Sequence, residues 1–334
     1  MDTECNNSQS LMILHIPHSS KDIPQCYGHG FIENEQEAVP ALTDHFTDNL
    51  FDYSAAHKVV FPISRIVCDV ERFETGEEME SKYGMGILYE RDHLQRPLRM
   101  ITAELKKEVV EKYYRPHHQR LFDAVKLELE KCNKALIVDC HSFNDEQLPH
   151  VQNSYRPDFC IGADLFHTPD VLTQKLIDYL QDKGYSVGVN APFSGTIVPM
   201  HYYQKNPNVV SIMIEINKRL YLTDNFSKSE TFNKTKETVA DMLEIMHNFI
   251  SRIILLNETI SDIEINKLAD ESTDEELDEI MSIEGNKEHI AKLDQKSKDR
   301  LNKILTMKIK ESFENIVKVM EDGNYEHLSD DDWK

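Results

Sequence analysis

Proline and glycine are confined almost entirely to the first two-thirds of this chain. All 12 prolines lie at or before Pro207, and only Gly285 and Gly323 of the 11 glycines lie beyond Gly195. Because these residues punctuate turns, the first part predicts a domain of many short elements and the rest predicts helix. We therefore predict two regions, a domain over residues 1–255 and an all-helical, acidic C-terminal extension over residues 256–334.

Short apolar runs alternate with helical patterns through the first region. All-apolar runs bounded by turn residues are typical of buried strands, and their alternation with helices predicts an α/β sandwich with a mainly parallel central sheet. The predicted strands cover residues 11–16, 58–61, 66–70, 135–140, 159–161, 187–189 and 209–216. The predicted helices cover residues 39–57, 98–129, 169–183 and 227–256.

The charge of the chain excludes some classes of partner. Lys and Arg total 37 against 59 Asp and Glu, a formal net charge of −22, which disfavours nucleic acid and anionic membrane surfaces. The first ten residues, MDTECNNSQS, have neither the basic nor the apolar segment of a secretory signal, so we expect a cytoplasmic protein. Residues 255–334 hold 22 acidic and 11 basic residues, so a protein partner for this acidic extension is one expectation.

Residues whose side chains could bind a metal ion or take part in catalysis lie where predicted strands end. That end of the strands is where α/β sheets bind ligands. His18 and His141 follow or end two such strands, and with one carboxylate they would supply the three protein ligands of a catalytic zinc site. Asp44 is the best candidate for that carboxylate, and Asp48, one helical turn later, is its rival. No HExxH motif supports the assignment, so the alternative that both histidines are hydrogen-bonded loop residues stays open.

Apart from Ser211, Glu215 is the one polar residue of the run VVSIMIEI at residues 209–216. Burying a carboxylate in a strand costs free energy unless it is paired or lies near a metal. We interpret Glu215 as a general base beside a metal-bound water, and the alternative is a strand-end carboxylate at the surface.

Three arginines flank predicted strands: Arg65, Arg72 and Arg219. In a chain this acidic, arginines near a site indicate bidentate binding of a small carboxylate. Surface ion pairs, which are common and contribute little, are the alternative.

A series of motifs between residues 13 and 221 resembles the N-formylglutamate amidohydrolase family. In chain order they are HIPHSS, TDHFTDNLF, SRIVCDVERF, GILY, YYRPHHQRL, DCHSF, PDFCIG, NAPFSGTIVP and SIMIEINKRLY. The resemblance covers about two-thirds of the chain. It implies a three-layer α/β/α fold like that of zinc carboxypeptidases, and hydrolysis of N-formyl-L-glutamate to formate and glutamate.

The resemblance also implies roles for particular residues. His18, His141 and Asp44 would bind zinc, and Glu215 would be the catalytic glutamate. Arg72 would bind a substrate carboxylate, with Arg65 and Arg219 as weaker candidates. Two departures bear on the substrate: Glu71 precedes Arg72 where some relatives have asparagine, and Lys218 stands where a second arginine is expected.

Two other functions fit the same residues. One is a peptidase or deacylase that acts on another N-acylated amino acid or peptide end. The other is a non-catalytic binding or regulatory protein that presents the acidic extension to a partner. Metal content and turnover of a small N-acyl amino acid distinguish these functions from the leading one.

Overall fold

The computed structural model describes residues 12–28, 31, 34–76, 79–145 and 155–258. The extension predicted for residues 256–334 lies outside these residues, except for the end of the last helix, and its helical nature stays a prediction. No helix in the described residues is long and apolar enough to cross a membrane.

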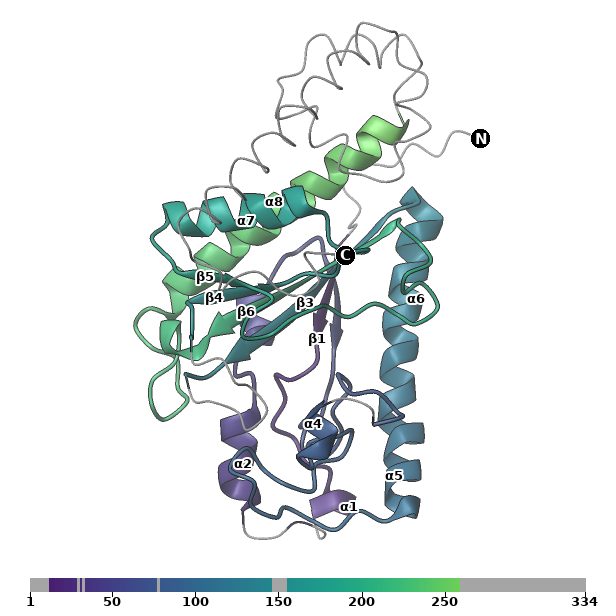
Figure 1. Cartoon of the computed structure of the whole chain (residues 1–334), viewed down its shortest axis with the longest axis vertical. Coiled ribbons are helices and arrows are strands. Elements are labelled where there is room, and N and C mark those ends of the chain that lie inside the picture. Colours follow the sequence, from purple (N-terminus) through teal and green to yellow (C-terminus); the bar gives the residue numbers. More distant parts are fainter. Residues whose placement is uncertain (1–11, 29–30, 32–33, 77–78, 146–154, 259–334) are drawn as a thin grey trace, which may run out of the picture. The chain divides into compact units, whose positions relative to one another are not determined.

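A six-stranded sheet forms the centre of the described domain, with strand order β2-β1-β3-β6-β4-β5 (Figure 1). β2, β1, β3 and β6 run parallel, β4 pairs antiparallel with β6, and β5 is parallel to β4. The predicted α/β fold with a mainly parallel sheet is confirmed. The strands are β1 (Met12–Ile16), β2 (His57–Val60), β3 (Ala135–Phe143), β4 (Phe159–Gly162), β5 (Val187–Val189) and β6 (Val209–Asn217).

The central strands are buried on both faces, as all-apolar strands require. Every residue of β1, β3 and β6 is buried, whichever face its side chain points to. Ile13 of β1 and Ile137 of β3 pack with residues of α6 on one face. The sheet therefore lies between layers of other elements rather than facing solvent.

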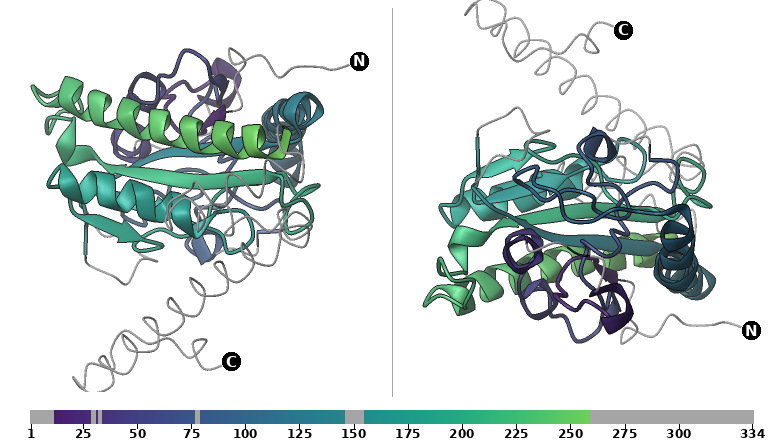
Figure 2. Two further views of the ribbon diagram at one scale, coloured as in Figure 1. Left: turned by 90° about the horizontal axis from the view of Figure 1, so that it is seen from above. Right: turned by 90° about the horizontal axis from the view of Figure 1, so that it is seen from below.

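The helices connect and cover these strands. α8 is the longest helix of the described residues, and Figure 2 shows it running along the sheet while α6 is seen nearly end-on. α7 and α8 are joined by a hydrogen bond from Tyr179 to Asp241. The helices are α1 (Gln25–Gly28), α2 (Glu35–Leu42), α3 (Thr47–Leu50), α4 (Met79–Lys82), α5 (Ala103–Val109), α6 (Arg115–Cys132), α7 (Asp170–Asp182) and α8 (Phe232–Glu258), with a π-helical turn η1 (Val110–Tyr114) between α5 and α6 and a 3-10 turn η2 (Lys218–Leu220) after β6.

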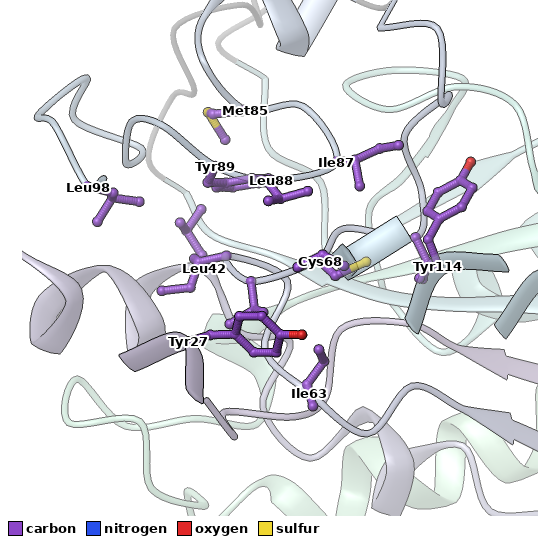
Figure 3. Packing of buried hydrophobic residues seen from close by; sticks show 14 of the residues in the cluster. Tyr27, Leu42, Ile63, Cys68, Met85, Ile87, Leu88, Tyr89, Leu98 and Tyr114 are labelled. Atoms are coloured by element: carbon purple, nitrogen blue, oxygen red, sulfur yellow. The ribbon is translucent and has the colours of Figure 1, made fainter. Parts of the chain in front are cut away.

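A second apolar cluster lies beside the sheet and supports the long segment of the chain between β2 and α6 (Figure 3). Its members come mostly from residues 61–114, with Tyr27 and Leu42 from the first helices. This cluster fixes the loop that carries Arg65, Asp69 and Arg72.

The prediction of a strand at residues 66–70 is wrong. This segment is a buried turn, in which the amide of Val67 donates to the carbonyl of Ser64, and so does that of Cys68. Its apolar side chains are buried in the second cluster rather than in the sheet. A short apolar run indicates that a segment is buried, but not whether it is buried in the sheet or in a separate cluster.

The helix predicted over residues 39–57 is also wrong in part. It is divided into α2 and α3 by an irregular stretch at residues 43–46, where Phe46 adopts a left-handed φ of 60°. The break turns the chain so that the Asp44 side chain faces the sheet end. The last residue of the predicted helix, His57, begins β2.

Candidate active site

Four polar side chains form a row across one face of the central strands. His15 of β1 is in register with Asp139 of β3, and His141 is in register with Glu215 of β6. Because residues two apart in a strand share a face, Asp139 and His141 point the same way. The row lies toward the carboxyl ends of parallel strands, where such sheets bind ligands.

Two further side chains meet His141 at the end of this row. His18, in the loop after β1, and Asp44, in the break between α2 and α3, join His141. Their ligand atoms form a small triangle: Nδ1 of His18 lies 3.3 Å from Nδ1 of His141. Asp44 Oδ2 lies 3.6 Å from the first nitrogen and 3.4 Å from the second. All three side chains are buried.

The outer nitrogens of both histidines are occupied by carboxylates. Nε2 of His18 lies 2.8 Å from Asp69 Oδ1, and Nε2 of His141 lies 3.0 Å from Asp139 Oδ1. A nitrogen that faces a carboxylate carries the proton, so each Nδ1 presents a lone pair to the centre of the triangle. Such carboxylate–histidine pairs are the usual outer shell of a metal site.

The triangle is suited to a small cation. Asp44 Oδ2 is buried and has no hydrogen-bond partner, and it faces two nitrogen lone pairs. Three such donors repel one another unless positive charge lies between them. Donors about 2.0–2.2 Å from one tetrahedral metal ion are about 3.3–3.6 Å apart, which matches the distances found. His18, Asp44 and His141 could therefore hold a metal ion together.

Electrostatics around the triangle favour ionised partners. Burial would raise the pKa of Asp44, but the adjacent imidazoles of His141 and His18 and the charge of Lys218 outweigh it and hold that pKa well below its usual value. Burial would lower the pKa of His141, but the charge of Asp139 outweighs it and raises that pKa well above its ordinary value. The cluster thus attracts positive charge, whether a proton or a metal ion.

Glu215 is a buried carboxyl group beside the triangle. Only 7% of the residue is exposed, and its Oε2 has no hydrogen-bond partner. Burial raises its pKa to about 8, with the charge of Asp44 acting in the same direction and that of His141 opposing it. An unpaired carboxyl group with a pKa near neutrality has the properties of a general acid–base catalyst.

Arg65 and Arg72 share a single buried carboxylate, that of Asp69. Arg65 donates to Asp69 Oδ2 through Nη2 at 2.8 Å and Nε at 3.2 Å, and Arg72 Nη2 lies 3.7 Å away. Tyr89 also donates to this oxygen, at 2.7 Å. Burial would raise the pKa of Asp69, but the two arginines outweigh it and hold the pKa well below its usual value. Two guanidinium groups against one carboxylate leave an excess positive charge next to His18.

Two residues considered from the sequence lie apart from this group. Arg219 forms ion pairs with Asp145 and Asp158, and 39% of its side chain is exposed. Asp48 is exposed, and its backbone carbonyl accepts a hydrogen bond from Lys58. The structure brings together His18, Asp44, His141, Glu215, Arg65 and Arg72, and it places Arg219 in a separate ion-pair network.

A second group of histidines and carboxylates supports the first. His15 Nδ1 lies 2.8 Å from Asp139 Oδ1, and its Nε2 lies 2.8 Å from Nε2 of His117 in α6. Glu71 Oε1 lies 3.2 Å from the same Nδ1. Distances of 2.8 Å are those of hydrogen bonds and are too short for two ligands of one tetrahedral metal ion. We therefore interpret this group as a buried hydrogen-bonded support for Asp139.

Sequence reasoning assigned no role to Asp69, Asp139, His15 or Lys218. Asp139 could have been found, because it is two residues before His141 in a strand and must share its face. Lys218 also lies in the site: its Nζ is 3.7 Å from Asp44 Oδ1. No local pattern pairs Asp69 with His18, because that contact depends on the fold of residues 61–114.

The fold and site together define a class of protein, an α/β protein with a donor cluster and a buried carboxyl group at the carboxyl ends of its parallel strands. Two solved structures share the fold. One is an N-formylglutamate amidohydrolase from Ralstonia eutropha JMP134, with a TM-score of 0.63, 19% identity, and coverage of 74% of this chain and 96% of that chain. The other is a gene product from Agrobacterium tumefaciens, with a TM-score of 0.53, 17% identity, and coverage of 76% and 94%.

Sequence comparison gives the family. An N-formylglutamate deformylase from Pseudomonas putida is 24% identical over 243 residues, which cover 70% of this chain and 90% of that relative. The family model for N-formylglutamate amidohydrolase matches residues 10–222. This chain belongs to the N-formylglutamate amidohydrolase family, and every residue of the site lies within the matched segment.

Proposed function

We propose that this protein is a zinc-dependent amidohydrolase that cleaves N-formyl-L-glutamate, or a closely similar N-acyl amino acid, to the free acid and the amino acid. The observation that carries the proposal is the triangle of His18 Nδ1, His141 Nδ1 and Asp44 Oδ2, with separations of 3.3–3.6 Å. Family membership and the name of the Pseudomonas putida relative support the reaction and the substrate.

The donor set favours zinc among the common metal ions. Two imidazoles and one carboxylate suit zinc better than magnesium or calcium, which prefer oxygen ligands. Three protein ligands leave a fourth position for water or substrate, as in catalytic rather than structural zinc sites. When bound, zinc would polarise the scissile carbonyl group and lower the pKa of its water to about 7.

Glu215 moves the proton in this mechanism. A water molecule loses a proton to Glu215 Oε2 as its oxygen attacks the formyl carbon. Glu215 then gives that proton to the amide nitrogen as the carbon–nitrogen bond breaks, which releases formate and the amine of the amino acid. The burial that raises the Glu215 pKa to about 8 makes it a stronger base than an exposed glutamate.

The arginines orient the substrate. Arg65 and Arg72 carry more positive charge than Asp69 neutralises, so one substrate carboxylate can bind near them. A guanidinium group binds a carboxylate through two parallel hydrogen bonds, which fixes the direction of the bound molecule. Such fixation lowers the entropic cost of reaching the transition state.

Metal analysis together with a substrate panel tests the proposal. We expect about one zinc per chain, and hydrolysis of N-formyl-L-glutamate that chelation abolishes and zinc restores. D44A should lose zinc, while D48A, a change at an exposed neighbour, should keep it. Full activity in metal-free protein, or equal zinc loss in both variants, would contradict the proposal.

A further inference from the structure

Lys218 is a buried cation in the site for which the proposed mechanism has no use. It is the first residue of η2, directly after β6, and 8% of its side chain is exposed. Its Nζ lies 3.7 Å from Asp44 Oδ1, which is beyond a good hydrogen bond. Within the described part of the chain, that oxygen is the one carboxylate oxygen within 4.0 Å of Nζ.

A buried ammonium group with so little pairing needs an explanation. It carries three donors, and its one carboxylate neighbour among the described residues, Asp44 Oδ1 at 3.7 Å, accepts none of them at good hydrogen-bond distance. Asp44 cannot satisfy this group alone, because its other oxygen, Oδ2, faces His18 and His141. Arg65 acts on Lys218 with a charge of the same sign, while Glu215 acts with the opposite sign. Lys218 therefore keeps donors for an anion that the chain does not supply.

The site thus offers cationic hydrogen-bond donors in two places. The first is Lys218, beside Asp44. The second is the pair Arg65 and Arg72, which share Asp69. A substrate with two carboxylates, such as an N-acyl glutamate, offers one anion to each place.

Distance from the donor triangle indicates which carboxylate binds where. Lys218 approaches a triangle member, Asp44, directly, whereas the arginines reach His18 only through Asp69. In an N-acyl amino acid the α-carboxylate is attached to the carbon next to the scissile amide nitrogen. The side-chain carboxylate of glutamate lies two methylene groups farther away. Lys218, the cation nearer to the triangle, therefore suits the α-carboxylate, which is the carboxylate nearer to the scissile amide.

We infer that Lys218 binds the α-carboxylate of the substrate, which leaves Arg65 and Arg72 for the side-chain carboxylate. The inference rests on the proposed function and adds a specificity residue to it. Arg219, the next residue in the chain, does not bind this carboxylate, because it forms ion pairs with Asp145 and Asp158. The site then selects N-acylated dicarboxylic amino acids through two separate cations.

The test compares three substrates on wild-type protein and K218M, a variant that keeps length but removes charge. The substrates are N-formyl-L-glutamate, its α-carboxamide and its side-chain carboxamide. We expect K218M to lose about 10- to 100-fold in kcat/KM on both substrates that carry an α-carboxylate, mainly through KM. It should lose little on the α-carboxamide, so the preference for an α-carboxylate disappears while the preference for a side-chain carboxylate remains.

Metal content of the same preparations and a second variant complete the experiment. K218Q should show the same loss of α-carboxylate preference, which covers the case in which K218M does not fold. Equal losses on all three substrates, or loss of zinc from both variants, would overturn the inference and make Lys218 a positioning residue for Asp44. A wild-type protein that hydrolyses none of the three substrates would instead overturn the proposed function.

Discussion

At the scale of single residues, the site depends on which nitrogen of each histidine is protonated. Asp69 and Asp139 each face Nε2 of a histidine at 2.8 and 3.0 Å, so both Nδ1 atoms are free to bind a cation. A chain of hydrogen bonds continues outward from Asp139 through His15 to His117, whose Nδ1 accepts from Arg120. The tautomers are thus set by buried neighbours and do not need the metal ion to define them.

The proton-transfer role proposed for Glu215 predicts a large fall in kcat when its carboxyl group is removed. E215Q keeps the shape of the side chain but cannot take a proton, so kcat should fall by about 10²–10⁴-fold. The zinc content should not change, because the triangle of His18, Asp44 and His141 does not include Glu215. Steady-state kinetics and metal analysis on one preparation measure both quantities. Loss of zinc along with activity would make Glu215 a ligand, and an unchanged kcat would remove it from the mechanism.

Glu215 also predicts a pH dependence of stability in the metal-free protein. Its folded-state pKa of about 8 lies above the ordinary value of 4.5. Below pH 4.5 the Glu215 carboxyl group is protonated in both the folded and the unfolded chain, and its full contribution to stability is present. As the pH rises from 4.5 toward 8, the unfolded chain ionises first, so this contribution is lost. Relative to E215Q, the wild-type protein in chelator should become progressively less stable across this range. Thermal melts of both proteins at several pH values measure the difference, and a constant difference would contradict the assigned pKa shift.

At the scale of elements, the strands were predictable because they are apolar and bounded by turns. The strand predictions near β1, β3 and β6 agree with the structure, and Glu215 lies within the buried strand β6. The segment 66–70 has the same composition, but its side chains are buried in a cluster beside the sheet. An apolar composition indicates that a segment is buried. Whether that segment joins the sheet depends on hydrogen-bond partners that are distant in the sequence.

The same distinction explains the site. His18, His141 and Glu215 could be chosen from sequence because each lies in or just after an apolar strand. Asp69 could not be paired with His18, since the contact joins residues 51 positions apart through an irregular loop. Lys218 was noted only as a departure from an expected arginine, because its burial depends on the turn after β6.

Close packing between β4 and the loop before Ile197 predicts a sensitive glycine. A Cβ on Gly162 would lie 2.2 Å from the carbonyl oxygen of Gly195 and 2.4 Å from Met213 Cε. G162A should therefore destabilise the protein by about 1–3 kcal/mol or more, because backbone must move. The loop also donates Ile197 N–H to Asp139, so zinc affinity should weaken as well.

Gly184 provides the control for this prediction. It has a φ of +84° but nothing within 4 Å of an added Cβ. G184A should cost only the conformational strain of about 1–2 kcal/mol and leave zinc affinity unchanged. Denaturant unfolding and zinc titration compare the two variants. Equal zinc affinity in both would show that the β4 contact does not reach the site.

At the scale of the whole molecule, the question is how much of the chain the site needs. The family match ends at residue 222, yet the described fold continues through α8 to Glu258. α8 supplies part of the core, and Tyr179 and Tyr53 hydrogen-bond to it through Asp241 and Glu244. Among its described side chains, the fully or nearly fully buried apolar ones are Phe232, Val239, Met242, Leu243, Met246, Phe249 and Ile250.

Truncation at two positions therefore has opposite expected results. A chain ending after Glu258 should fold and hydrolyse substrate, because it keeps α8 and every residue of the site. A chain ending at Asn225, just beyond the family match, should be insoluble or unfolded. Removing α8 deletes seven buried apolar side chains, each worth about 1.5–3 kcal/mol when fully buried, and exposes the core surface that they cover. That loss is comparable to the whole stability of a typical domain, about 5–15 kcal/mol.

Circular dichroism, thermal melts and activity of the two chains measure the outcome. An inactive or unfolded chain ending after Glu258 would show that residues 259–334 are needed for the fold or the site, and would contradict the division of the chain predicted from its proline and glycine distribution.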